Sequence, residues 1–130
     1  MARELIAVDT SVLIPWLNRT EFREGSHFEQ LGATDRIVLP PVTLAEAFAG
    51  PPLPSDMADA LRGLPLLAPL DGYWERAGLL RARSLRLARR ARLGDALIAQ
   101  ACIDADVPLL TADSDFQVFA DVGGLRLYEA

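Results

Sequence analysis

The 130-residue sequence contains no lysine, one cysteine and one histidine. Without lysine, the chain cannot bind phosphate through a P-loop lysine, form a Schiff base, or act as a receiver domain, which needs a lysine at its phosphorylation site. The single Cys102 excludes an internal disulfide and a thiolate metal site. The single His27 leaves little scope for a multi-histidine metal centre or a Ser-His-Asp triad. We expect Cys102 to be a small core residue and His27 a surface or packing residue.

Long apolar runs are also missing. The longest, at 64–70, is much shorter than the roughly 20 residues of a membrane span, and it contains proline. The first residues show no basic segment followed by a long apolar stretch, as a secretory signal would. Hydrophobic residues make up 51% and charged residues 24%, which is ordinary for globular proteins and argues against disorder. We therefore expect one cytoplasmic domain over residues 1–130, with no membrane association.

Short apolar runs alternate with helical patterns along the chain. Strands are predicted at 5–8, 37–39, 66–67, 107–110 and 125–128, and helices at 12–17, 21–32, 42–49, 55–64, 73–92, 95–105 and 116–120. Thr10 or Ser11 is expected to cap the first helix and Thr43 the third, and Gly94 is expected to separate the two long helices. Asp106 suits a left-handed position after the helix 95–105. Strands separated by helices predict an α/β domain whose mainly parallel central sheet is flanked by helices on both faces.

Four carboxylates stand at unusual places in this pattern. Asp9 and Asp113 lie just past the carboxyl ends of predicted buried strands, at the sheet edge where open α/β sheets bind ligands. Asp95 opens an apolar helix, and Glu46 lies inside another. A carboxylate among apolar neighbours is costly to bury without a partner, so a divalent cation shared by several acids is one solution. Each acid also has an ordinary interpretation: a helix cap, a turn residue like Asp115, or an exposed helix face.

Four segments resemble the PIN-domain ribonucleases, and in particular the VapC-type toxins of toxin–antitoxin pairs. They are VDTSVLI at 8–14, LAE at 44–46, GDALIA at 94–99 and LTADSDF at 110–116. The resemblance covers the whole chain in the family's order, and 95–116 is its most specific part. It implies a PIN-like three-layer α/β/α fold and a catalytic site of four acids, Asp9, Glu46, Asp95 and Asp113. It further implies that Asp9, Asp95 and Asp113 bind metal, supported by Thr10, Ser11, Thr111 and Asp115.

The resemblance also implies a reaction, which is hydrolysis of RNA phosphodiester bonds that leaves a 3′-hydroxyl and a 5′-phosphate. Mg²⁺ or Mn²⁺ held by carboxylates would lower the pKa of a water molecule and neutralise charge on the phosphate. Glu46 would be a further ligand or would orient the attacking water. The residues do not distinguish one metal ion from two. As a toxin, the protein would pair with an antitoxin and form a homodimer.

Arginine is concentrated in one segment. The formal net charge is −5, yet residues 76–92 carry seven of the thirteen arginines and no acid, so the remaining positions have a net charge of −12. If 73–92 is one helix, Arg83, Arg86 and Arg90 fall within about 60° of one another around its axis. They are therefore candidates for RNA backbone contact, because arginine binds phosphate bidentately. A protein partner's surface or a plain solvated helix face would explain the same run.

Two other functions fit the pattern less well. A non-catalytic PIN-fold binding or scaffold module would be expected to have lost some of the four acids, and all four are present. A phosphatase of the haloacid type would need a second aspartate two residues after Asp9, where Ser11 stands. The sequence therefore favours a metal-dependent ribonuclease.

Overall fold

The computed structural model describes residues 4–18 and 36–129. The predicted helix 21–32 and His27 lie outside this described part. The described strands are β1 (Ile6–Val8), β2 (Ile37–Val38) and β3 (Leu109–Leu110). The described helices are α1 (Thr10–Asn18), α3 (Pro41–Ala49), α4 (Ser55–Arg62), α5 (Tyr73–Arg86), α6 (Leu93–Ala105), the short 3-10 helix η1 (Ser114–Phe116) and α7 (Gln117–Gly123). Within these ranges, no helix has the length and apolar character needed to cross a membrane.

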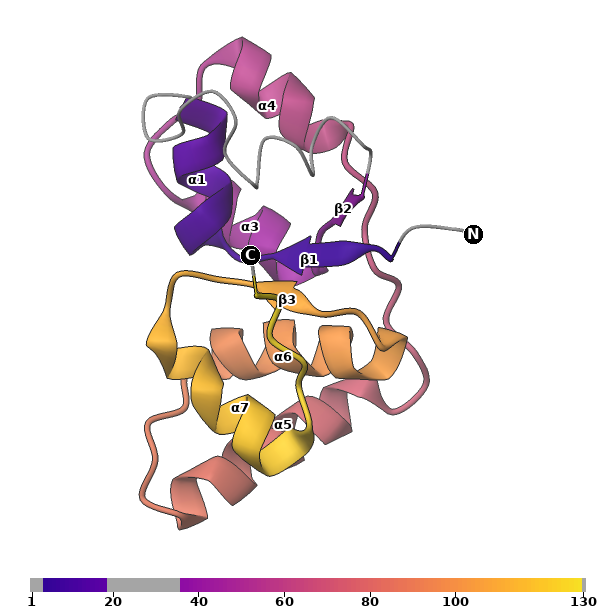
Figure 1. Cartoon of the computed structure of the whole chain (residues 1–130). Helices are drawn as coiled ribbons and strands as arrows, with labels where there is room; N and C mark the ends of the chain where they lie inside the picture. The colour runs from indigo at the N-terminus through magenta and orange to yellow at the C-terminus, as the bar shows by residue number, and fades with distance from the viewer. Residues whose placement is uncertain (1–3, 19–35, 130) are drawn as a thin grey trace.

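The three strands form one parallel sheet in the order β2-β1-β3 (Figure 1). Single parallel bridges extend it at both edges, from Leu39 to Leu66 beside β2 and from Leu109 to Leu127 beside β3. The strands predicted at 66–67 and 125–128 are thus reduced to one bridged residue pair each. Parallel pairing brings the carboxyl ends of all three strands to the same edge of the sheet.

Side chains on the strands alternate between two hydrophobic cores. Ile6 and Val8 belong to the core formed with α1, α3 and α4, whereas Ala7 between them belongs to the core formed with α5, α6 and α7. Figure 1 shows the same division, with α1, α3 and α4 on one side of the sheet and α5, α6 and α7 on the other. Cys102 is fully buried in the second core, as expected. The predicted three-layer α/β/α arrangement with a parallel sheet is confirmed.

Thr43 holds α3 against the sheet and does not cap the helix. The helix begins at Pro41, which needs no hydrogen-bond partner at that position because proline has no N–H. Thr43 is fully buried, and its Oγ1 donates a 3.0 Å hydrogen bond to the backbone oxygen of Val8. The prediction of a Thr43 cap was therefore wrong. The hydrogen bond instead connects the helix that carries Glu46 to the strand that precedes Asp9.

The long helix predicted over 73–92 ends at Arg86. The backbone N–H groups of Leu87 and Arg89 both bond to the carbonyl oxygen of Ser84, and between them Ala88 adopts a left-handed conformation with φ 55°. Residues 87–92 then lead into α6. The helical period gave no sign of this turn, because alanine, leucine and arginine are all good helix formers.

Gly94 lies in the first turn of α6, because this helix already begins at Leu93. The prediction that Gly94 separates the two long helices was therefore wrong. At the other end of α6, Asp106 adopts the predicted left-handed conformation, with φ 53° and ψ 47°. Its backbone N–H bonds to the carbonyl oxygens of the last helical turn. The helix is thus placed with Asp95 in its first turn, facing the carboxyl edge of the sheet.

Candidate active site

Asp9 directly follows β1 and is only 4% exposed. Ser11 Oγ donates to its Oδ1 at 2.7 Å, and Thr111 Oγ1 donates to its Oδ2 at 3.0 Å. Burial raises the pKa of Asp9, the two hydroxyl hydrogen bonds oppose that increase, and nearby Asp113 adds to it. Ser11 was one of the two expected caps of α1, but its hydroxyl is engaged by the Asp9 side chain instead. Each oxygen of the buried carboxylate thus accepts a hydrogen bond from a side-chain hydroxyl group.

The loop after β3 is fixed against the start of α1 by backbone groups. The N–H of Ala112 donates to Ser11 Oγ at 2.9 Å, and the N–H of Asp113 donates to Thr111 Oγ1 at 3.0 Å. Two residues further along the same loop, the N–H of Asp115 donates to Asp113 Oδ1 at 2.9 Å, so Asp113 caps η1. This network fixes the position of Asp113 relative to the end of β1.

Three carboxylates lie close enough to share a cation. One oxygen each from Asp95, Asp113 and Asp115 lies within 4.8 Å of the other two, and all three residues are partly buried. Asp115, predicted only as a supporting residue, is a member of this group. Asp9, predicted as a ligand, lies outside it and has both carboxylate oxygens bonded to hydroxyls. The signal that could have identified Asp115 is its position two residues after Asp113 in a turn that Asp113 caps.

The four predicted acids nevertheless form one electrostatic cluster. Burial raises the pKa of Asp95 to about 6, with further increases from Asp113, Glu46 and Asp9, while Arg92 acts in the opposite direction. Partial burial and the charge of Asp9 raise the pKa of Glu46. Like charges at short range favour protonation, and so they favour any cation that can replace the protons.

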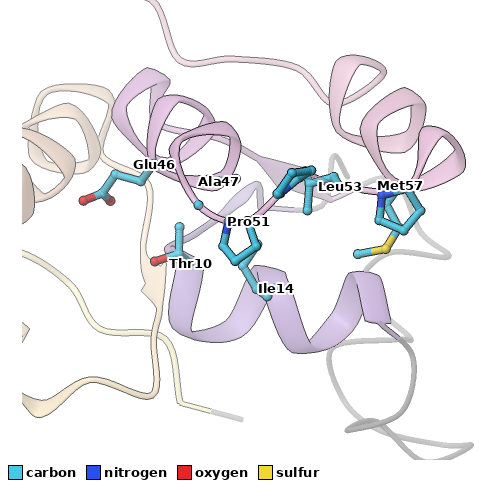
Figure 2. Close-up of a pocket in the computed structure, with 10 residues that line it drawn as sticks. Thr10, Ile14, Glu46, Ala47, Pro51, Leu53 and Met57 are labelled. Atoms are coloured by element: carbon cyan, nitrogen blue, oxygen red, sulfur yellow. The ribbon is translucent and has the colours of Figure 1, made fainter.

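Glu46 reaches from α3 towards the start of α6. A Cβ atom at Gly94 would lie 3.2 Å from Glu46 Oε2, so the absent side chain gives the carboxylate room to approach the helix. Figure 2 shows the Glu46 carboxylate directed towards α6 and away from Pro51 and Met57. Gly94 is therefore better explained as space for this carboxylate than as a helix break.

Two arginines from the segment between α5 and α6 lie beside the acids. Arg90 Nε is 3.5 Å from Asp115 Oδ2, and the positive charge of Arg92 lowers the pKa of Asp95. Both arginines are largely exposed. Part of the arginine-rich segment thus borders the carboxylates directly, although the sequence pattern had placed the arginines on a separate helix face.

The three arginines predicted to contact RNA do not share one helix face. Arg83 and Arg86 are exposed on α5, whereas Arg90 lies beyond the end of that helix. The prediction that these arginines cluster around one helix axis was wrong for Arg90, because the chain turns at Ala88. Arg90 is the member of the set that reaches the acidic cluster.

Fold and site together define a three-layer α/β/α domain with a carboxylate cluster at the carboxyl edge of a parallel sheet. Residues 6–122 match the PIN domain family, and the chain belongs to that family. The resemblance seen in the sequence is thereby confirmed at the level of the family. Among curated proteins, none matches this chain.

Solved structures of toxin–antitoxin complexes contain chains with the same fold. A chain of VapBC-5 from Mycobacterium tuberculosis is 22% identical, with a TM-score of 0.69 over 98% of this chain and 100% of its own length. A chain of VapBC2 from Rickettsia felis, bound to a fragment of promoter DNA, is 16% identical, with a TM-score of 0.72 over 95% and 97%. A chain of DNA-bound VapBC from Salmonella typhimurium is 20% identical, with a TM-score of 0.72 over 97% and 98%. At these identities the likeness establishes the fold.

Proposed function

We propose that this protein is a metal-dependent endoribonuclease and the toxin of a toxin–antitoxin pair. The observation that carries the proposal is the grouping of Asp95, Asp113 and Asp115 at the carboxyl edge of a PIN domain, with Asp9 and Glu46 in the same electrostatic cluster. Five acids of this kind, with no lysine anywhere in the chain, suit chemistry in which a bound cation supplies the positive charge.

The donor set fits a hard divalent cation. Mg²⁺ and Mn²⁺ prefer oxygen ligands, and Mg²⁺ is usually held by one or two carboxylates together with water and substrate phosphate. Three carboxylates that can each direct one oxygen to a common point meet that requirement. Asp95, Asp113 and Asp115 would hold the ion. When bound, it would lower the pKa of a water molecule and neutralise charge on the phosphate.

The remaining acids have separate tasks in this proposal. Asp9 contributes negative charge to the cluster, and its bonds to Ser11 and Thr111 hold the loop that carries Asp113 in place. Glu46, the most exposed of the predicted acids, would accept a hydrogen bond from the attacking water and take its proton. Its raised pKa makes it a stronger base than an ordinary glutamate. Thr10 begins α1 beside this site and was predicted to support it.

Arginines near the site would bind the RNA backbone. Arg90 lies beside Asp115, where a phosphate held at the acids would pass within reach of a guanidinium group. Arg83 and Arg86 extend the positive charge along the exposed face of α5. We propose all three as RNA contacts, with Arg90 closest to the reacting phosphate.

The partners follow from the same proposal. The structural relatives come from complexes named as toxin–antitoxin systems, which supports an antitoxin partner for this chain. We further propose a homodimer, a single domain over 1–130 and a cytoplasmic location. A short upstream reading frame encoding a DNA-binding protein would support the toxin role.

Cleavage of single-stranded RNA by the purified protein tests the activity, with Mg²⁺, with Mn²⁺ and with EDTA. We expect cleavage with either metal, none with EDTA, and 5′-phosphate ends on the products. Asp95→Asn, Asp9→Asn and Asp113→Asn should each lower the rate by about 100-fold or more, since even indirect partners of metal ligands contribute about 10- to 100-fold. Asp71→Asn is a matched control, because Asp71 is exposed on the loop before α5.

Two outcomes would contradict the proposal. Near wild-type rates in two of the three aspartate variants, with contaminating nuclease excluded, would show that the assigned site is wrong. A folded wild-type protein that cuts no RNA with either metal would instead favour a non-catalytic binding module.

A further inference from the structure

An apolar hollow lies next to the acidic cluster. Its volume is about 280 Å³, and α1, α3, α4 and the proline-rich loop between α3 and α4 surround it (Figure 2). Ile14 on α1, Pro51 on the loop and Met57 on α4 supply apolar walls, and most of the lining surface is apolar. A volume of this size is at the low end of ligand pockets, so it suits one small ring system better than an extended ligand.

The hollow and the acidic cluster share residues. Thr10, which directly follows Asp9, lines the hollow, and so does Glu46. Figure 2 shows Glu46 at one side of the hollow, with its carboxylate directed towards α6 and away from Pro51 and Met57. The negative charge of Glu46 raises the pKa of Asp95, so the Glu46 side chain also belongs to the acidic cluster. A molecule held at the acids could therefore extend past Thr10 and Glu46 into the hollow.

We propose that this hollow binds one unpaired base of the RNA whose phosphate lies at the acidic cluster. This rests on the proposed ribonuclease function and adds to it a subsite for the substrate. A nucleobase is a flat, uncharged group joined to the backbone phosphate through one sugar, so it can occupy an apolar site beside an ionic one. Its faces would lose water against Ile14, Pro51 and Met57.

The subsite also determines the form of the RNA. A base in a duplex is stacked and paired, and placing it in the hollow would require extrusion from the helix. Single-stranded RNA has bases that are free to turn outward, and proteins bind such bases in pockets of this kind. The hollow therefore selects single-stranded RNA over duplex RNA. An apolar side chain of a protein partner is the competing occupant, but it would not explain the shared residues Thr10 and Glu46.

Gly50 offers a way to fill the hollow without strain. It lines the hollow at the end of α3, its φ of −77° is open to any residue, and an added Cβ meets nothing nearer than 3.8 Å. Gly50→Phe should therefore fold and occupy the space. Gly78→Phe is the matched control, because Gly78 lies exposed on α5 and an added Cβ there has no atom within 4 Å.

The experiment combines these variants with RNAs that lack one base. A short single-stranded RNA that the wild type cuts at one mapped bond is compared with copies carrying an abasic nucleotide at each position around that bond. We expect one position at which the lost base lowers kcat/KM of the wild type by about tenfold, as for a lost stacking contact. Gly50→Phe should lower kcat/KM on intact RNA by a similar factor and be insensitive to that abasic position. Gly78→Phe should behave as the wild type.

Several results would overturn the inference. Wild-type kcat/KM for Gly50→Phe on intact RNA, or an undiminished abasic effect in that variant, would mean that the base binds elsewhere. Normal cleavage with weakened antitoxin binding would assign the hollow to a protein side chain. If circular dichroism shows that Gly50→Phe is unfolded, Met57→Ala removes one wall and must show the same loss of abasic sensitivity. If the wild type cuts no RNA, the ribonuclease proposal fails, and equal affinity for intact and abasic RNAs by fluorescence anisotropy would overturn the base site as well.

Discussion

Asp9 shows how this protein keeps a carboxylate buried at the end of a strand. Two hydroxyl groups satisfy its two oxygens, and one of them comes from a residue 102 positions away. The same hydroxyls accept hydrogen bonds from the loop that carries Asp113. The small polar residues of the two motifs are thus explained by one network, in which Ser11 and Thr111 connect the Asp9 carboxylate to the backbone of the loop that carries Asp113.

The pKa of Asp95 predicts how the metal-free protein responds to pH. Its value of about 6 in the folded protein lies above its ordinary value of 3.8, so the folded form binds more protons between these two pH values. The stabilising contribution is therefore complete below about pH 4 and is lost as pH rises to about 6. In EDTA, urea unfolding should show that Asp95→Asn loses less stability than the wild type over this window.

Comparison of the two proteins isolates the contribution of Asp95. Asp104, whose pKa is lowered mainly by its hydrogen bond from Arg76, contributes the opposite trend in both proteins, and its effect cancels. A wild type that gains stability relative to Asp95→Asn between pH 4 and 6 would contradict the raised pKa. A variant that is much less stable at every pH would indicate that Asp95 serves mainly to stabilise the first turn of α6 through its negative charge.

Arg90 should matter more for RNA cleavage than the arginines of α5. We expect Arg90→Ala to lower kcat/KM by about tenfold or more, because a hydrogen bond to a charged group contributes about 1.5–3 kcal/mol. It should also reduce the salt dependence of RNA binding by a slope of about 0.7, as for one lost phosphate contact on a single strand. Arg83→Ala and Arg86→Ala should have smaller effects on kcat/KM.

Arg126→Ala is the control for this series, because Arg126 pairs with Glu4 and Asp106, which precede β1 and β3 at the opposite edge of the sheet. Its kcat/KM should stay near that of the wild type. An unchanged salt slope in Arg90→Ala would assign the arginine-rich segment to a protein partner or to plain solvation.

At the scale of elements, the end of α5 decides where the arginines lie. An L-residue in the left-handed conformation costs about 1–2 kcal/mol, and Ala88 bears this cost. Ala88→Gly removes this conformational cost. The greater freedom of glycine in the unfolded chain, however, lowers the stability by about 0.4–1 kcal/mol. The variant should thus be as stable as the wild type or up to about 1.6 kcal/mol more stable in urea unfolding.

Ala82→Gly provides the comparison within the helix. Ala82 lies inside α5, where glycine in place of alanine costs about 1 kcal/mol. If Ala82→Gly and Ala88→Gly lowered the free energy of unfolding equally, residue 88 would be helical, as the sequence pattern had predicted. A stability loss in Ala82→Gly together with a stability gain in Ala88→Gly would support the turn that brings Arg90 close to the acids.

For the whole molecule, metal binding should be visible as stability. Mn²⁺ or Mg²⁺ that binds only the folded protein adds about 2.7 kcal/mol at 100 times its dissociation constant. Millimolar Mn²⁺ should therefore raise Tm, and should raise it more at pH 8 than at pH 5, where protons compete for the carboxylates. Asp95→Asn should weaken this response and Asp71→Asn should retain it. A Tm indifferent to Mn²⁺ in the wild type at pH 8 would count against a metal site.

Much of this architecture could be predicted from local patterns. Apolar runs of strand length between helical periods indicated a parallel sheet with helices on both faces, because parallel strands are buried on both sides. Asp9 and Asp113 were found because they follow strands, and the ends of parallel strands meet at one edge. The left-handed Asp106 was predicted from its place after an apolar helix and before a strand. These features depend on neighbours in the sequence, so the sequence was sufficient.

Other features depended on contacts between distant segments. The turn at Ala88 is invisible to helical periodicity, since good helix formers continue through it, yet the folded chain leaves the helix there through a left-handed residue. Thr43 resembles a cap by position, yet its hydroxyl bonds to Val8 because α3 lies against β1. The arrangement of the carboxylates was decided in the same way. Residue types and spacing could name the acids. Which of them lie close enough to share a cation depends on distances between side chains of two separate segments, and those distances exist only in the folded chain.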